Sequence, residues 1–406
     1  CMAAELMAAG YSDKEAILAQ LKLKAKYMWR PSLLNPKDKL PHTIKKAALF
    51  PFNKEMHGLV RFSDLLSFEI TDVYDVKYSG HVGAATDHLL GDQTVTSLKV
   101  QNINKIDWER IDTLILGHME QLSAAINYDD LLADLLVQAQ KHGVFVYAFD
   151  DLTSVLQSLD TPPEVYFPSV TSKDLPSFQF GKLYRISKPV LGVFGTSSKQ
   201  GKFTVQLELR RRFLKAGYEI GQIGTEPTAL LYGMDCVFPF GYHTTVQLDR
   251  YDVVRYLNYE VSQLCEKSEI ILVGSQSGIV SYDLGNLQQI PLVNYEFLIG
   301  TQPDAVILCV NPYDSIDFLE KTIGLLESAA SAKVIALVLF PMKLKSNWSG
   351  IYGGKTKMAA EEITEVKEWL FKTFNRPVFC LGVPEEMDQL AEISAEFFAV
   401  DSSINE

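Results

Sequence analysis

Three absences bound the class of protein to which this sequence belongs. Cysteine is scarce: five cysteines are scattered over 406 residues without a C-x-x-C pair, so neither a disulfide framework nor a cysteine zinc site is expected. No apolar run approaches the roughly eighteen residues that span a bilayer, and the first residues lack the basic, apolar and small-residue order of a secretory signal. We therefore expect a cytoplasmic protein with no membrane partner.

Positive charge is also in deficit. The sequence has 38 lysines and arginines against 50 aspartates and glutamates, a formal net charge of -12. Because nucleic-acid binding depends on basic side chains that neutralise phosphates, no nucleic-acid partner is expected. A small phosphorylated ligand needs only a local positive site and stays compatible with this charge.

Proline-containing segments divide the chain into three parts. Apolar side chains recur at helical spacing over residues 5–29, and prolines follow at positions 31, 36 and 41. We interpret residues 1–42 as a helical extension and linker, whose exposed face could contact a partner or a second copy in a homo-oligomer, or pack on its own domain. A second proline-containing stretch at 162–176 predicts the boundary between domains 43–185 and 186–406.

Both larger parts alternate short apolar runs with helix-length segments, which is typical of parallel α/β domains. The first part contains four such runs, at 47–50, 68–74, 112–117 and 143–149. The second contains six, at 190–194, 218–223, 269–274, 304–310, 333–340 and 377–383. The chain is thus expected to fold into two successive α/β domains.

A glycine-rich stretch, G-T-S-S-K-Q-G-K-F-T, follows the first strand of the second domain. It resembles the phosphate-binding pattern G-x-x-x-x-G-K-[ST], in which backbone N–H groups wrap phosphates and a lysine neutralises them. Five residues separate its glycines instead of four, and Phe203 precedes the hydroxyl residue. A strand-to-helix turn without a ligand is the alternative, but such a turn has no need of Lys202. The candidate phosphate- or nucleotide-binding residues are Gly195, Thr196, Ser197, Ser198, Lys199, Gln200, Gly201, Lys202, Phe203 and Thr204.

Together with I-G-Q-I-G-T-E-P-T-A-L-L-Y-G, G-T-Q-P-D-A-V-I-L-C and H-G-L-V-R-F, this stretch resembles the DgcN-type D-glutamate N-acetyltransferase-like family, formerly known only as a domain of unknown function. The resemblance extends from about residue 46 to about residue 340. It implies a Rossmann-like N-terminal domain, a P-loop NTPase-like parallel-sheet domain, and acetyl transfer from acetyl-CoA to the amine of a small amino acid such as D-glutamate. The family's loop resembles G-T-x-x-x-x-G-K-x-T, which accounts for the position of Thr204.

One departure from the family bears on the reaction. Where members tend to carry an acidic residue after the third strand, this chain has G-S-Q-S-G, with Ser275 and Gln276. A carboxylate there would hold Mg²⁺ or its water, so its absence weakens the case for ATP hydrolysis and leaves a role for Mg²⁺ open; no metal-ligating residue is assigned. Two alternatives remain: an ATP-dependent carboxylate-activating ligase similar to dethiobiotin synthetase, and a non-catalytic nucleotide- or metabolite-binding protein.

The remaining site candidates lie after other strands, because doubly wound sheets bind ligands at the carboxyl ends of their strands. The substrate-binding candidates are Arg61, Thr225, Glu226, Thr228, Ser275, Gln276 and Asn311. Arg61 could grip a carboxylate with two hydrogen bonds, whereas the residues at 225–228 could instead cap a helix. Asn311 and Asp314 follow the fourth strand and are better candidates than Asp304, which precedes it.

His243 is the candidate catalytic base, since an imidazole could deprotonate an amine before acyl transfer; a hydrogen-bonded surface histidine is the alternative. In the first domain no G-x-G-x-x-G follows the opening strand, so a dinucleotide is not expected there. Gly117 and His118 end another strand of that domain and could face the second domain.

Overall fold

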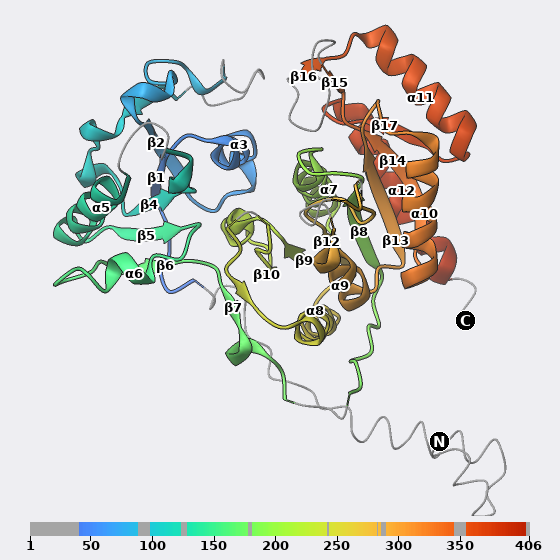
Figure 1. Ribbon diagram of the computed structural model, residues 1–406, viewed down its shortest axis with the longest axis horizontal. Coiled ribbons are helices and arrows are strands. Elements are labelled where there is room, and N and C mark those ends of the chain that lie inside the picture. The colour runs from blue at the N-terminus through green and yellow to red at the C-terminus, as the bar shows by residue number, and fades with distance from the viewer. Residues whose placement is uncertain are drawn as a thin grey trace, which may run out of the picture. The chain divides into compact units, whose positions relative to one another are not determined.

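Two large parallel β-sheets carry the described part of the chain (Figure 1). The computed structural model describes residues 40–87, 98–122, 128–177, 181–241, 243–281, 283–285, 290–344 and 355–402. Of the helical extension expected over residues 1–42, only the last three residues lie within these ranges. The α/β class predicted from the alternating apolar runs is confirmed.

The first sheet has the strand order β3-β2-β1-β4-β5-β6, with all neighbours parallel. Its strands are β1 (Lys46–Phe50), β2 (Glu69–Asp75), β3 (Val100–Asn102), β4 (Thr113–Leu116), β5 (Phe145–Ala148) and β6 (Val165–Tyr166). Four coincide with predicted runs, whereas β3 and β6 are too short to show a hydrophobic pattern. The chain continues from β1 to β2 in one direction and from β4 to β5 in the other. This reversal creates the switch point at which open α/β sheets bind ligands.

The second sheet has the order β10-β9-β12-β8-β13-β14-β17, again parallel throughout. Its strands are β8 (Val190–Gly195), β9 (Ile220–Gly224), β10 (Cys236–Val237), β12 (Ile270–Gly274), β13 (Ala305–Val310), β14 (Lys333–Leu339) and β17 (Val378–Cys380). All six predicted runs form strands, and the two-residue β10 was not predicted. Strand β8, which leads into the glycine-rich loop, lies between β12 and β13, so the loop begins near the centre of the sheet.

Helices connect most of these strands. They are α3 (Lys54–Arg61), α5 (Tyr128–His142), α6 (Thr153–Leu156), α7 (Lys202–Lys215), α8 (Arg250–Leu264), α9 (Leu292–Thr301), α10 (Ile316–Ala330), α11 (Ala360–Phe374) and α12 (Pro384–Ser402). Among these described helices, none is both long enough and apolar enough to cross a bilayer.

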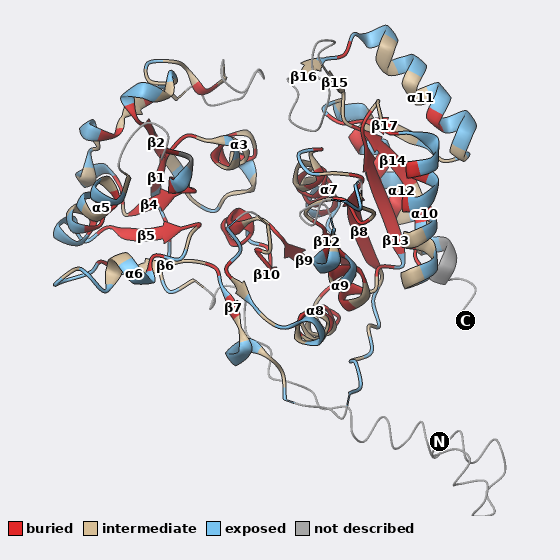
Figure 2. Cartoon of the chain, viewed as in Figure 1, coloured by how far each residue is buried: buried red, intermediate tan, exposed pale blue. Residues whose placement is uncertain are grey.

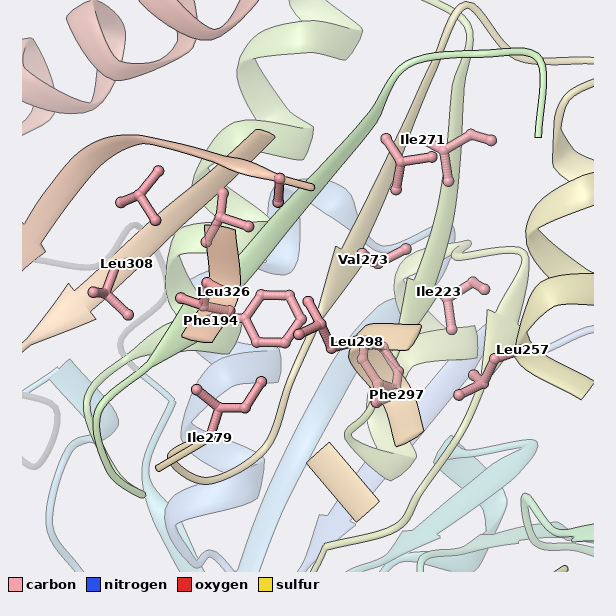
Figure 3. Close-up of a cluster of buried hydrophobic side chains, with 14 of the residues drawn as sticks. Phe194, Ile223, Leu257, Ile271, Val273, Ile279, Phe297, Leu298, Leu308 and Leu326 are labelled. Atoms are coloured by element: carbon pink, nitrogen blue, oxygen red, sulfur yellow. The ribbon is translucent and has the colours of Figure 1, made fainter. Parts of the chain in front are cut away.

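Both faces of the second sheet are covered by helices. The side chains of β8 alternate between the faces: Phe194 joins a buried cluster with α8, α9 and α10, and Val193 joins another with α7 and α12. Figure 3 shows Phe194 within the first cluster, where its ring centroid lies 6.3 Å from that of Phe297 on α9. The strand that carries the loop is therefore held from both sides.

One buried cluster contains residues from both halves of the chain. It joins side chains of β1 and α3 to Leu207 on α7 and to Tyr232, the last residue of a 3₁₀ helix (Pro227–Tyr232). The Tyr147 hydroxyl on β5 donates a hydrogen bond to the Pro227 carbonyl at 2.6 Å. Figure 2 shows the strands of both sheets buried and the outer faces of helices such as α5 and α11 exposed. Because α7 begins at the loop, this shared cluster ties the loop to the first half.

The connection between the sheets runs from Tyr166 to Val190. Within it, β7 (Val170–Thr171) pairs with β11 (Val246–Gln247) of the second half. We keep domains 43–185 and 186–406 as a proposal, with the boundary inside this connection. A further pair, β15 (Met342–Leu344) and β16 (Lys355–Lys357), is antiparallel.

Candidate phosphate-binding site

The glycine-rich loop links the end of β8 to the start of α7. Gly201 caps the helix in the left-handed region, with φ 76°, and a Cβ there would overlap the Leu381 side chain. A Cβ on Gly195 would lie 2.6 Å from Gln200 Oε1. Both glycines are therefore required by the loop's shape. The first backbone bond into α7 runs from Val205 to Gly201, so the first N–H groups of the helix have no partner within it and the positive end of its dipole faces the loop.

Lys202, the first residue of α7, is the central cation of the site. It is only 5% exposed, and its Nζ donates to the carbonyl oxygen of Ser197 at 2.6 Å. Burial lowers the pKa of Lys202 to about 8. Since an anionic ligand favours the charged form of a lysine, this side chain is poised to gain charge when phosphate binds.

Three more lysines, Lys54, Lys199 and Lys355, contribute positive charge near the loop. Lys54, in the first turn of α3, opposes the charge of Lys202. Lys355 on β16 is acted on by Lys199 and Lys54, and its pKa lies below the usual value, mainly because of burial. Lys54 thus acts on both Lys202 and Lys355, so positive charge is concentrated near the loop of a chain with net negative charge, as a phosphorylated ligand needs.

Hydrogen bonds hold the loop in shape from within. Gln200 Oε1 accepts from the Ser197 N–H at 2.9 Å, and Gln200 Nε2 donates to Thr196 Oγ1 at 2.5 Å. Thr196 Oγ1 donates to Asp314 Oδ2 at 2.6 Å, and the Asn311 N–H donates to the same oxygen at 2.7 Å. Burial raises the pKa of Asp314, although these hydrogen bonds oppose the shift. The side chains of Thr196 and Gln200 therefore support the loop through Asp314.

The segment after β12 packs directly on the loop. The Ser275 N–H donates to the Val193 carbonyl at 3.0 Å, and a Cβ on Gly278 would overlap the carbonyl of Thr196. Gln276 Nε2 donates to the Thr225 carbonyl at 2.7 Å. Ser275 Oγ, like Asn311 Oδ1, is buried and has no hydrogen-bond partner among the described residues. The segment after β12, where a carboxylate was expected, therefore supports the loop through backbone contacts and places the Ser275 hydroxyl beside it.

A carboxylate reaches the site from a different strand. Glu226 follows β9, and the charged groups acting on it include Lys202, Lys54 and His118. Burial raises its pKa, and the two lysines oppose that shift. No group of three or more His, Cys, Asp or Glu side chains within the described ranges could hold a metal ion. Two carboxylates, Glu226 and Asp314, are too few to enclose Mg²⁺ by themselves. They fit an ion that keeps several waters and also binds the phosphates of a ligand.

The other loop residues divide by environment. Ser198 and Lys199 are exposed, and Thr204 is half-buried in the first turn of α7. The side chain of Phe203 packs in the cluster shared by both halves, 5.9 Å from the Tyr232 ring. Phe203 can therefore contribute only its backbone N–H to a phosphate. Thr225 and Thr228 are each 2% exposed, so Thr225 offers its backbone to Gln276 and Thr228 lies within the 3₁₀ helix.

His243 lies near the first sheet. Its Nε2 forms an ion pair with Glu120 Oε2, and its ring centroid is 5.6 Å from that of His118. Arg61 ends α3, where it acts on His57 and on Tyr232. The basic residue of α3 that acts on Lys202 and on Glu226 is Lys54, at the start of the helix, whereas Arg61 is at its end.

Several residues of this region were not assigned from the sequence. They are Lys54, Glu55, Glu120, Asp150 and Lys355. A signal existed for two of them, because Lys54 follows the first strand closely and Asp150 lies two residues after β5, at the carboxyl edge where ligand sites form. No sequence signal placed Lys355 near the loop, since its position depends on the β15–β16 pairing.

Comparison with known proteins agrees with this architecture. A protein-family model described as "Domain of unknown function (DUF1611_C) P-loop domain" matches residues 177–387, and no curated protein matches the chain. The crystal structure of a DUF1611 family protein from Anabaena variabilis is 14% identical, covers 82% of this chain and 95% of that chain, and has a TM-score of 0.57. A nucleotide-binding protein from Archaeoglobus fulgidus in complex with ADP is 12% identical, covers 50% of this chain and 85% of its own, and has a TM-score of 0.32. Because the family match extends over more than half of the 406 residues, the protein belongs to the DUF1611 family, and its second half contains the family's P-loop domain.

Proposed function

We propose that this protein is an N-acyltransferase that binds the phosphates of acetyl-CoA at the loop 195–204 and transfers the acetyl group to the amine of a small amino acid such as D-glutamate. The observation that carries phosphate binding is the buried Lys202 at the start of α7, beside the positive end of the helix and three further lysines. Acetyl transfer is supported by the resemblance of the loop and strand-end motifs to the D-glutamate N-acetyltransferase-like family.

The structure allows a role for each part of the loop. Backbone N–H groups of residues 198–204 and the Lys202 ammonium would hold a pyrophosphate. Lys355 and Lys54 would face its outer oxygens. Acyl transfer needs no metal in this arrangement, because the lysines supply the positive charge. Acceptor binding is then assigned to the polar groups around Glu226.

A second candidate is ATP-dependent activation of a carboxylate. It is favoured by Glu226, which follows β9 and interacts electrostatically with Lys202. This carboxylate could serve in place of the one that is missing directly after β12. With Asp314 behind the loop, the site then has the one or two carboxylates that accompany a magnesium nucleotide. This candidate predicts Mg²⁺-dependent binding of ATP and release of phosphate.

Binding of acetyl-CoA and of ATP with and without Mg²⁺, measured by calorimetry, separates these candidates. We expect acetyl-CoA to bind the wild type without Mg²⁺, and Lys202→Met to weaken its binding about 10- to 100-fold, because charge-assisted hydrogen bonds contribute about 1.5–3 kcal/mol. Lys215→Ala, at the exposed end of the same helix, is the matched control and should bind like the wild type. Methionine keeps the volume of the buried side chain, so the variant should remain folded.

Proton uptake gives a second readout. At pH 8.5 the free protein holds Lys202 partly neutral, since its pKa is about 8. Phosphate binding raises that pKa, so the binding enthalpy should depend on the ionisation enthalpy of the buffer, and this dependence should vanish in Lys202→Met. Mass spectrometry of D-glutamate incubated with acetyl-CoA and protein then tests the reaction itself. Binding of Mg-ATP alone, with phosphate release and no acetylated product, would replace the first candidate by the second.

A further inference from the structure

The carboxyl edge of the first sheet carries a second group of polar residues. Strand β1 leads to Lys54 and Glu55 in the first turn of α3, β4 leads to His118, and β5 leads to Asp150. Strands β1 and β4 flank the switch point of the sheet, where a ligand site is expected, and β5 lies next to β4. Glu226 from the second half acts on Lys54, Glu55 and His118, so this edge and the P-loop lysine share one carboxylate as a neighbour.

His118 and Asp150 form a pair with defined geometry. His118 Nδ1 lies 2.6 Å from Asp150 Oδ1, and the Met119 N–H donates to Asp150 Oδ2 at 3.2 Å. His118 is 4% exposed, and its ring packs edge-on against Phe149. Because the carboxylate accepts from Nδ1, that nitrogen carries a hydrogen and Nε2 is the nitrogen that exchanges a proton. A carboxylate that orients a histidine in this way is the arrangement of a general base.

The surroundings of His118 favour its protonated form. Burial alone would lower the pKa of His118, but the hydrogen bond to Asp150 and the negative charges of nearby carboxylates outweigh it, so the pKa is raised. The described titratable groups that act on His118 or contact its ring include Asp150 after β5, Glu55 on α3, Glu226 after β9 and His243 before β11, and His243 in turn pairs with Glu120. His118 is therefore a stronger base than an ordinary imidazole.

We propose that His118, oriented by Asp150, is the catalytic base that takes a proton from the amine of the amino-acid acceptor proposed above, and that this acceptor binds at the carboxyl edge of the first sheet. The edge offers charge of both signs: Lys54 for a carboxylate of the acceptor, and Glu55 and Glu226 for its ammonium group. The inference rests on the proposed function for the acyl donor, but the acceptor site is a separate set of residues.

The reaction balances without any further reactant. His118 Nε2 takes one proton from the ammonium group and leaves a neutral amine. The nitrogen lone pair forms a bond to the carbonyl carbon of the thioester, and the carbon–sulfur bond breaks with its electron pair on sulfur. A second proton from the nitrogen ends on that sulfur as a thiol. One amide and one thiol form, and the proton held by His118 passes to solvent.

His118 is better placed for this role than His243, the residue that the sequence indicated. His118 lies two residues after the end of β4, and its buried side chain pairs with Asp150. His243 has a positive φ of 54° and a side chain that is 31% exposed. A base must hold its nitrogen in a fixed position; His118 is held by a pair in which it is buried, whereas the ion pair of His243 with Glu120 joins two partly exposed side chains.

The test compares four variants in acetyl transfer from acetyl-CoA to D-glutamate, followed by thiol release and mass spectrometry. His118→Gln should lower kcat about 10²- to 10⁴-fold, with the Kd for acetyl-CoA unchanged within about twofold. Asp150→Asn should lower kcat less and move the acid limb of the pH profile to lower pH, because His118 loses the carboxylate that raises its pKa. The control is His142→Gln on α5, which also removes a histidine paired with a carboxylate, and it should leave kcat unchanged. His243→Gln should cost less than His118→Gln.

Two outcomes of this assay overturn the inference: a kcat in His118→Gln close to that of the wild type, or a larger loss in His243→Gln. A binding readout keeps the inference separate from the P-loop proposal. In protein with ¹³C-labelled histidine, D-glutamate should shift the resonance and the titration of His118, whether or not acetyl-CoA binds. Failure of acetyl-CoA to bind, with His118 still shifted, would sink the proposed donor and support the acceptor site. No shift of His118 at saturating D-glutamate overturns the inference even if acetyl-CoA binds.

Discussion

The carboxyl edges of the two sheets, where we propose that the donor and the acceptor bind, differ in the groups that they carry. At the second sheet the loop after β8 is shaped by close packing of its backbone: Gly201 has a left-handed φ and no room for a Cβ beside Leu381, and Gly278 lies against the Thr196 carbonyl. At the first sheet the corresponding edge has no glycine-rich loop, and its polar groups are the charged side chains of Lys54, His118 and Asp150. The second edge combines the N–H groups of its loop with the Lys202 ammonium, whereas the first edge has charged side chains of both signs.

This difference is consistent with the proposal that the second edge binds the phosphates of the donor and the first edge binds the acceptor. Phosphates are bound by backbone N–H groups that point to one place. A loop of that shape needs glycine where its backbone passes close to other atoms. A small acceptor has a few charged groups at its ends, and side chains that reach from different strands can meet each of them. The contrast predicts that backbone volume matters most at the second edge and side-chain charge at the first.

The largest effect is expected for Gly278→Ala. The new Cβ would meet the backbone carbonyl of Thr196, which cannot move without shifting the loop. We expect a loss of about 1–3 kcal/mol in the free energy of unfolding, typical of overpacking, together with loss of acetyl-CoA binding. Chemical denaturation and calorimetry measure the two quantities.

Gly117→Ala is the matched substitution at the first edge. Its Cβ would lie 3.1 Å from the end of the Met56 side chain and 3.2 Å from that of Asn53, and both can adjust. We expect a loss below about 1 kcal/mol, since flexible side-chain ends relax more readily than backbone. Equal losses in the two variants would remove the distinction between the edges.

The same contrast explains what the sequence could predict. The apolar runs identified ten strands because parallel strands buried on both faces are continuous in hydrophobicity. The loop was recognisable because its glycines and Lys202 are adjacent in sequence. Short strands such as β10 have too few residues for a pattern, and they were missed.

Proximity between the two halves could not be predicted. Lys54 and His118 act electrostatically on Glu226 because Leu207 and Tyr232 of the second half pack in one cluster with β1 and α3. That packing is a tertiary property with no local signature. Consequently the sequence indicated His243 as the base and Arg61 as the carboxylate partner, where the proposal above assigns His118 and Lys54.

An intermediate effect on stability at acid pH is expected from His57 on α3. Its pKa is lowered to about 4, first by burial and then by Arg61 and other positive neighbours. The unfolded chain, with a histidine pKa near 6.5, binds more protons between pH 4 and 6.5, so the folded protein loses stability as the pH falls through this window. After discounting for solvent screening at a partly exposed group, the loss is about 1–2 kcal/mol.

His57→Gln should remove this loss. Compared with the wild type, the variant should gain stability at pH 4.5 relative to pH 7.5, as measured by urea denaturation at both values. The gain arises at the first edge, whereas the stability difference between Lys202→Met and the wild type should be constant below about pH 8 and should vary with pH only above it, where the folded wild type loses the Lys202 proton before the unfolded chain does. If the difference between wild type and His57→Gln were the same at pH 4.5 and 7.5, the assigned pKa of His57 would be wrong.

The smallest effect is expected for Arg211→Ala, which removes a link between the halves rather than a part of either edge. Arg211 on α7 bonds Asp64 through Nε at 2.7 Å and Nη2 at 2.5 Å, and its guanidinium lies 4.7 Å from the centroid of the Phe62 ring. Both partners of the ion pair are partly exposed, so we expect a loss of only about 0.5–1 kcal/mol. A double-mutant cycle with Asp64→Ala measures the coupling, and Lys321→Ala, which breaks an exposed pair with Asp317 inside α10, controls for loss of a surface charge. Since the buried cluster with Leu207 and Tyr232 holds the halves together, acetyl-CoA binding should persist in Arg211→Ala. A loss of several kcal/mol would instead assign the joining of the halves to this ion pair.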